Sequence, residues 1–189
     1  MAEPEEINES IEQITESLKE EKQREKWTAY IALSTAIIAV IAAIVGLYGS
    51  QAASRSIIAK NEAVLYQNQA SDAWAYYQAK GIKEDIYMVG AKTTPRFAKD
   101  LQAEAGRYDQ EKEKIKKQAE VLETKVERSN KESETNYERH HIFDYSETFL
   151  HIAIALAAIS ALTRSKPFWA LSLLLSLIGI VIFGFGLAI

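Results

Sequence analysis

The sequence predicts an all-α fold: a membrane protein with three transmembrane helices and a long antiparallel helical hairpin of the coiled-coil type. Residues 27–48, 149–162 and 168–189 carry almost no charged side chains, whereas residues 97–141 are rich in Glu, Lys and Arg. Small side chains recur at spacings of three and four along residues 27–90, the period of closely packed helices. We expect an amphipathic helix at 1–26, a transmembrane helix at 27–48, a hairpin stalk at 49–142 with its turn near 90–96, and transmembrane helices at 143–162 and 168–189.

The N-terminal segment combines a narrow apolar stripe with many acidic side chains. Ile7, Ile11, Ile14 and Leu18 follow one another at spacings of 4, 3 and 4 residues. Such a stripe is typical of a helix that packs on a copy of itself or on a neighbouring protein. Because the segment begins acidic and the first apolar run starts only at residue 27, it lacks the pattern of a cleaved signal peptide. We expect the first span to be retained as an anchor.

The first span has aromatic residues where the two membrane interfaces are expected, Trp27 and Tyr30 at one end and Tyr48 at the other. No proline follows before residue 90, so we expect the same helix to continue into the stalk. Small residues mark one side of it and predict that another helix lies flush against it, with a slip of phase between residues 50 and 52. They are Ala32, Ala36, Ala39, Ala43, Gly46 and Ser50 in the span, and Ala52, Ser56, Ala59, Ala63, Tyr66, Ala70, Ala73 and Tyr77 in the stalk.

Gly90 and Pro95 predict the turn of the hairpin, with the glycine ending one helix and the proline opening the next. The returning helix has few apolar positions. Several of them lie eleven residues apart, which favours a nearly straight or slightly right-handed coil. They are Phe97, Leu101, Tyr108, Ile115, Ala119, Leu122, Val126 and Tyr137.

The last two spans differ in length. The purely apolar part of the second, residues 148–162, is too short to cross a hydrocarbon core of about 30 Å by itself. The third follows a tight turn at 163–167 and opens with Phe168 and Trp169. Glycines near its end allow another helix to pack closely: Gly179, Gly184 and Gly186.

Composition excludes several classes of function. The net charge of −4 does not provide the basic surface that nucleic-acid binding requires. Because the chain has no cysteine, it has neither a disulfide framework nor a thiolate metal site. It also lacks a glycine-rich phosphate loop, a His-Glu-x-x-His motif and a Gly-x-Ser-x-Gly motif. We expect neither catalysis nor a cofactor.

Four ionisable residues at the start of the second span share one helical face: His140, Asp144, Glu147 and His151. Because the apolar run is short, we expect Glu147 and His151 at or below the membrane interface, where such groups normally face protein or water. The four residues are weak candidates for a divalent-metal or proton-relay site completed by a neighbouring helix or by other copies of the chain in a symmetric oligomer. The alternative is an interfacial polar stripe that pairs with Arg55 or Lys60.

The stalk segment 60–87 is rich in amide and aromatic side chains, which a helix does not require for its own formation. Amides and Tyr hydroxyls can hydrogen-bond across a helix interface and fix its register. The segment therefore predicts a specific interface, either between packed helices or with a partner or ligand. The candidate oligomer or partner interface residues are Ala59, Ala63, Tyr66, Ala70, Ala73, Trp74 and Tyr77.

The same segment carries a resemblance to a known family. Glu25-Lys26-Trp27, and the stretch KNEAVLYQNQASDAWAYYQAK at 60–80, resemble a bacterial family of small multi-span membrane proteins of unknown function. The resemblance implies a membrane location and several spans. It implies no activity, cofactor or catalytic residue.

These observations favour a membrane-anchored coiled-coil scaffold or accessory protein that forms a homo-oligomer, with the lipid bilayer and another membrane protein as further partners. Two alternatives stay open: an ion or proton channel lined by the polar face of the second span, and a membrane sensor that binds a divalent metal. We expect a multi-pass protein of the bacterial inner (cytoplasmic) membrane, with a cytoplasmic N-terminus and an extracytoplasmic hairpin. The reason is that basic residues gather before the first span and in the short turn between the second and third spans, which lie on the same side of the membrane. They are Lys19, Lys22, Arg24, Lys26, Arg164 and Lys166.

Overall fold

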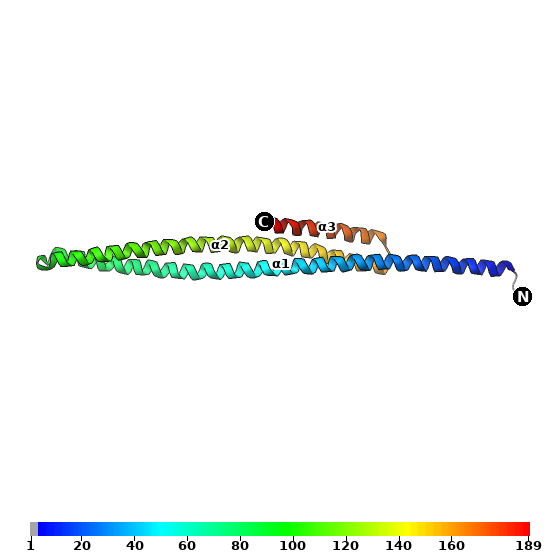
Figure 1. Cartoon of the computed structure of the whole chain (residues 1–189), viewed down its shortest axis with the longest axis horizontal. Helices are drawn as coiled ribbons and strands as arrows, with labels where there is room; N and C mark the ends of the chain where they lie inside the picture. The colour runs from blue at the N-terminus through cyan, green and yellow to red at the C-terminus, as the bar shows by residue number, and fades with distance from the viewer. Residues whose placement is uncertain (1–3) are drawn as a thin grey trace. The chain divides into compact units, whose positions relative to one another are not determined.

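The computed structural model describes the backbone of residues 4–189 and the side chains of residues 13–189. α1 covers Pro4–Thr93, the short 3-10 helix η1 covers Pro95–Phe97, α2 covers Ala98–Thr163 and α3 covers Lys166–Ala188 (Figure 1). The described residues contain no strand, and α1, α2 and α3 each contain a stretch long and apolar enough to cross a membrane. The predicted all-α fold with a helical hairpin is confirmed.

The chain divides into two compact units, each of which is described by itself. The bundle unit comprises Met1–Gln51 and Arg139–Ile189, and therefore contains the first part of α1, the last part of α2 and all of α3. The hairpin unit is Ala52–Glu138 and contains the remainder of α1 and α2 with η1 between them.

In the hairpin unit, α1 and α2 run side by side in opposite directions (Figure 1). The predicted stalk seam lies on the buried side of α1. Its buried members are Ala52, Ser56, Ala59, Ala63 and Ala70, and Tyr66, Ala73 and Tyr77 are half-buried. The helix that lies against this seam is the chain's own α2.

The buried side of α2 follows the same spacing of three and four residues. Ala105, Ile115, Ala119, Ser129, Ser133 and Asn136 are buried, and Tyr108, Lys112, Leu122 and Val126 are half-buried between them. Phe97 and Tyr137 are 52% and 54% exposed. The pairs Tyr108/Ala119 and Ile115/Val126 therefore lie on the seam with the predicted eleven-residue spacing, whereas Phe97 and Tyr137 lie off it.

The turn of the hairpin lies at Thr94, and Gly90 remains inside α1. The backbone N–H of Thr94 donates to the carbonyl of Gly90 over 2.9 Å, and that of Phe97 donates to Thr94 over 3.1 Å. A Cβ atom on Gly90 would lie 3.5 Å from a methyl carbon of Leu101. The glycine thus permits contact with α2 and does not end the helix as expected.

In the bundle unit, the buried face of α1 lies one position away from the predicted small-residue stripe. Ile31, Ile38, Ala42, Val45 and Gly49 are buried. Ala32, Ala36, Ala39, Ala43 and Ser50 are exposed, and Gly46 is half-buried. Since Gly49 and Ala52 differ by three positions, the buried residues follow one heptad frame without the predicted slip of phase.

Close packing between α2 and α3 depends on glycine and serine. A Cβ on Gly179 would lie 3.0 Å from Cγ of Leu150, and a Cβ on Gly186 would lie 2.7 Å from the Phe143 ring. A Cβ on Gly184 would meet nothing within 4 Å. Of the three glycines expected to allow close packing, Gly179 and Gly186 therefore do so.

Aromatic residues form two clusters on the bundle unit. The Trp27 and Trp169 rings meet edge to face at 5.1 Å. Tyr48 contacts the rings of Phe143 and Phe183 at 6.1 and 5.6 Å. Since Trp27 and Tyr48 both lie on α1, a rise of 1.5 Å per residue separates the two clusters by about 30 Å.

The predicted N-terminal apolar stripe is described in part. Ile14 and Leu18 are 58% and 55% exposed on α1. The side chains of Ile7 and Ile11 lie outside the described residues.

Candidate functional site

The four ionisable residues predicted at the start of the second span lie on α2 in the bundle unit and form two pairs. Nδ1 of His140 lies 3.3 Å from Oδ1 of Asp144, although without the geometry of a hydrogen bond. Nε2 of His151 lies 4.0 Å from Oε1 of Glu147. The side chains of His151 and Glu147 are 61% and 33% exposed, so this polar face is open in the single chain.

Two glycines of α1 lie against this polar face, and Gly46 makes room for Glu147. A Cβ atom on Gly46 would lie 2.9 Å from Oε1 of Glu147, and a Cβ on Gly49 would lie 3.6 Å from Oδ1 of Asp144. Glu147 therefore lies at the level of Gly46, near the Tyr48 end of the first apolar run. His151 lies one helical turn, about 6 Å, further toward the middle of that run.

Within the single chain, the two pairs remain separate. No group of three or more His, Asp, Glu or Cys residues that could hold a metal ion occurs among the residues described. The structure therefore does not gather the weak metal candidates His140, Asp144, Glu147 and His151. The physical reason is that α1 presents Gly46 and Gly49 to them and offers no further ligand.

In the hairpin unit, polar side chains join α1 to α2 at separate levels. Ser56 and Ser133 each donate a hydroxyl to the other's carbonyl oxygen, over 2.9 and 3.0 Å. Lys60, one of the expected partners of the polar face, instead donates to Oδ1 of Asn130 over 2.9 Å. These bonds fix the register of the hairpin, because an alanine seam alone does not distinguish one heptad from the next.

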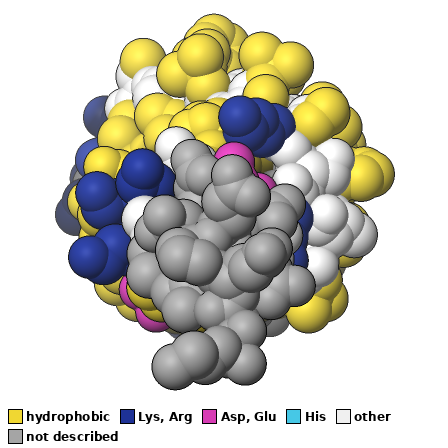
Figure 2. Space-filling model, turned by 90° about the vertical axis from the view of Figure 1, so that its right-hand side faces the viewer, with side chains coloured by type: hydrophobic (Ala, Val, Ile, Leu, Met, Phe, Trp, Pro, Cys, Tyr) yellow, Lys and Arg dark blue, Asp and Glu magenta, His cyan; other side chains and the backbone are white. Residues whose placement is uncertain are grey.

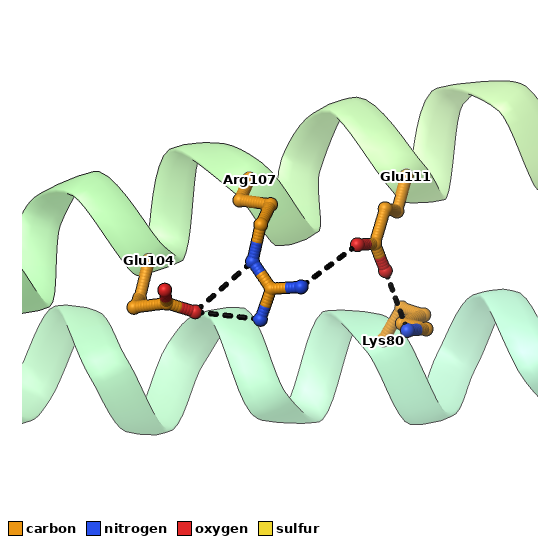
Figure 3. A network of polar contacts seen from close by, with 4 residues as sticks. All are labelled: Lys80, Glu104, Arg107 and Glu111. Carbon is orange, nitrogen blue, oxygen red and sulfur yellow. Dashed lines mark hydrogen bonds and ion pairs between the residues drawn. The ribbon is translucent and has the colours of Figure 1, made fainter.

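A larger network lies nearer the turn (Figure 3). Arg107 bridges two carboxylates of α2: its Nη2 lies 2.6 Å from Glu104 and its Nη1 lies 3.2 Å from Glu111. Lys80 of α1 donates to the other oxygen of Glu111 over 2.5 Å. The Lys80 ammonium also lies 5.0 Å from the ring centre of Tyr76, and a cation over an aromatic face is attracted to it.

The charges of this network stabilise one another. The hydrogen bond from Lys80 holds the pKa of Glu111 below its ordinary value, and the same bond raises the pKa of Lys80. The hydrogen bond to Glu104 raises the pKa of Arg107. These shifts favour the charged forms of Glu111, Lys80 and Arg107, so the arrangement suits a structural ion-pair network and does not supply a group prepared for proton transfer.

The seven candidate interface residues lie where α2 meets α1. Ala59, Ala63 and Ala70 are buried in the single chain, and the other four are half-buried: Tyr66, Ala73, Trp74 and Tyr77. Nε1 of Trp74 donates to Oε1 of Glu123 on α2 over 2.8 Å. α2 of the same chain covers the three buried alanines, and the four half-buried side chains keep part of their surface accessible, so a role of these residues in an oligomer or partner interface stays a prediction.

Comparison with protein families finds a match that covers both units. Residues 27–189 match the family described as Domain of unknown function (DUF4337). The chain belongs to this family. The family match begins at Trp27, the first residue of the first apolar run, and its description supplies no activity. Neither the comparison with curated proteins nor that with solved structures finds a match.

The sequence analysis missed the serines that hold this family member's bundle unit together. Ser146 donates to the carbonyl oxygen of Gly179 over 2.8 Å, and Ser172 donates to that of Ala153 over 2.7 Å. Both serines are fully buried. A serine inside a membrane-length apolar run is a usable signal, because hydroxyls there commonly hydrogen-bond across helix contacts.

Proposed function

We propose that the chain is a membrane-anchored interaction protein: three spans hold the helical hairpin beside a bilayer, and copies of the chain assemble into a homo-oligomer. The function is structural and requires no catalysis. The observation that carries the proposal is an apolar stripe left exposed on the closed hairpin.

The stripe lies on α1, away from the buried seam, in the part of the hairpin unit nearer the turn. Ala75, Ala79, Ile82, Ile86 and Val89 follow one another at spacings of 4, 3, 4 and 3 and are all exposed. Ile82, Ile86 and Val89 are 61%, 63% and 59% exposed. Single exposed apolar residues are ordinary, but a continuous stripe on a charged helix is typical of a surface that another helix covers.

Features of the bundle unit support the membrane location. Its two aromatic clusters are separated by about 30 Å along α1, which is the thickness of the hydrocarbon core. Aromatic residues favour the two boundaries of that core.

Two exposed features of the bundle unit favour a second copy as the partner. The small residues Ala32, Ala36, Ala39 and Ala43 leave one side of α1 free for close approach by another helix. His151 is exposed at a depth where an ionisable side chain is stable only against protein or water. Assembly of copies would cover both.

The insertion that we propose places the N-terminus and the turn between α2 and α3 in the cytoplasm and the hairpin outside. The basic residues before the first span and in the short turn support this orientation, because positive charge in short segments is retained on the cytoplasmic side. A protease-accessibility measurement on intact cells tests this orientation. Cleavage of the charged hairpin only after cell lysis would show that the orientation is the opposite one.

Mass measurement of the detergent-solubilised chain tests assembly. The wild type should be an oligomer, and Ile86→Glu should dissociate it, since an isoleucine buried at an interface contributes about 2 kcal/mol, or roughly thirtyfold in affinity. Ile57→Glu is the matched control: Ile57 lies on the same helix and is 62% exposed, but off the stripe. A monomeric wild type would overturn the proposal. Equal effects of the two variants would show that the stripe is not the interface between copies.

The second candidate is an ion or proton channel, and the open polar face of α2 is the observation that favours it. In an oligomer, the Glu147 and His151 faces of several copies could line a common path. Glu147→Gln should then abolish ion flux in liposomes while leaving the oligomer mass unchanged. A scaffold without a conducting path predicts no flux in either the wild type or the variant.

A further inference from the structure

A basic pocket lies at the Trp27 end of the bundle unit. Its volume is about 520 Å³, and residues of α1 and of the turn between α2 and α3 line it. Four of the lining residues are cationic and one, Glu20, is acidic; the cations are Arg24, Lys26, Arg164 and Lys166. Figure 2 shows Lys and Arg side chains beside hydrophobic ones at this end of the chain.

The cations of this pocket have no carboxylate partner among the described side chains. Among the side chains described from residue 13 onward, none of the four forms an ion pair with a carboxylate. Nε of Arg24 donates to the backbone oxygen of Glu20 over 3.3 Å, and this bond does not involve the carboxylate of Glu20. The pocket therefore holds an excess of positive charge.

Trp27 also lines the pocket, and its indole ring meets that of Trp169 edge to face. Its Nε1 is buried, so this N–H does not face the pocket. The indole of Trp169 donates from its Nε1 to Oγ of Ser34 over 3.2 Å. The ring of Trp27 therefore gives the pocket an apolar side next to the four cations.

The turn carries an arginine where the backbone favours glycine. Arg164 has a φ of 53°, in the left-handed region, and it is followed at once by Ser165 and Lys166. The ammonium of Lys166 lies 5.8 Å from the ring centre of Trp27, so the turn holds cationic side chains directly over the end of the first apolar run. This is the level at which lipid headgroups meet the hydrocarbon core.

We propose that this pocket binds the phosphate group of an anionic phospholipid. A phosphate diester supplies the negative charge that the four cations lack, while the acyl chains would lie along the apolar spans. The proposal rests on the proposed membrane location. If the chain does not sediment with membranes, the proposed membrane location is wrong. If the chain is membrane-bound but shows no preference for anionic lipid, only the proposed lipid-binding pocket is wrong.

The test counts lipids retained by the detergent-purified full chain in native mass spectrometry, with phosphatidylglycerol and phosphatidylcholine offered separately. The wild type should retain phosphatidylglycerol in preference to phosphatidylcholine. The double variant Arg164→Gln/Lys166→Gln should bind phosphatidylglycerol roughly thirtyfold more weakly, because each cation at a membrane surface changes affinity by about fivefold. The matched control Lys19→Gln/Lys22→Gln removes the same charge from residues that do not line the pocket and should bind as the wild type does.

A second variant tests the contribution of the indole. Trp27→Phe keeps an aromatic ring beside Trp169, and because the Nε1 that it removes is buried, the variant should retain phosphatidylglycerol as the wild type does. Equal retention by the pocket double variant and its control overturns the proposal. Displacement of the lipid by millimolar inorganic phosphate also overturns it, because the pocket would then be a site for soluble phosphate.

Discussion

Gly179→Ala tests whether the backbones of α2 and α3 are in contact. The added Cβ would lie 3.0 Å from Cγ of Leu150 and 3.1 Å from the carbonyl oxygen of Ser146. The Leu150 side chain could turn, but the carbonyl belongs to α2 itself, so the two helices must separate. Separation would also lengthen the hydrogen bond that Ser146 donates to the carbonyl of Gly179.

The size of the effect follows from opposing contributions. Overpacking a close contact costs about 1–3 kcal/mol, and weakening the serine hydrogen bond costs about 1 kcal/mol more. Alanine in place of glycine inside a helix returns about 1 kcal/mol through its higher helix propensity. Gly179→Ala should therefore destabilise the chain by about 2 kcal/mol. Gly184→Ala is the matched control on the same helix, and it should stabilise by up to about 1 kcal/mol because its Cβ meets nothing within 4 Å.

The assay is thermal unfolding of both variants and the wild type in one detergent, followed by tryptophan fluorescence. For a chain of this size a loss of about 2 kcal/mol corresponds to a fall of roughly 4–8 °C in the midpoint. Gly184→Ala should unfold at or above the wild-type midpoint. If Gly179→Ala were as stable as Gly184→Ala, the close contact between α2 and α3 would be refuted.

Three further predictions concern single contacts. The hairpin should lose stability below about pH 4.5 and above about pH 10.5. The lowered pKa of Glu111 means that folding favours the ionised carboxylate, and the raised pKa of Lys80 means that folding favours the protonated amine. Thermal melts followed by circular dichroism at several pH values measure this, and a midpoint that does not change with pH would show that the pair contributes nothing. Ser133→Ala should cost about 1 kcal/mol through the hydrogen bond lost to Ser56, measured in the same melts, and an unchanged midpoint would contradict it. Glu147→Gln should leave the thermal midpoint nearly unchanged, since the carboxylate faces only Gly46 and a partly exposed histidine; a large loss would assign Glu147 a role in packing.

The hairpin seam could be predicted because residues of two kinds alternate there. In the stalk, small residues stand out against Glu, Lys and Gln, so Ala59, Ala63 and Ala70 were identified as a packing surface. The sequence did not reveal that α2 of the same chain covers them, because a heptad pattern specifies a packing face and not the molecule that fills it.

The first span could not be interpreted in the same way, because most of its residues are apolar and any side of it resembles a packing surface. The sequence analysis selected the series that contains Ala32 and Ala36, whereas Ile38 and Ala42 are the buried residues. Continuing the heptad frame backward from Ala52 would have identified the correct side.

The polar face of α2 was predicted as a shared surface but not as two pairs. Spacing along one helix places His140 near Asp144 and Glu147 near His151, and that much follows from helical geometry. The room that Gly46 makes for Glu147 depends on how α1 packs against α2, and the spacing of residues along one helix does not give this. The same holds for Ser146, whose partner lies on a different helix.

Only Arg164 and Ser165 separate α2 from α3, and the hydroxyl of Ser160 donates to the carbonyl of Ser165 over 2.9 Å. With so short a connection, α2 and α3 form a closed helical hairpin, and the bond from Ser160 lies at its tip. In the proposed membrane location, the short apolar part of α2 would therefore cross the bilayer as one half of this hairpin, with α3 as its immediate neighbour.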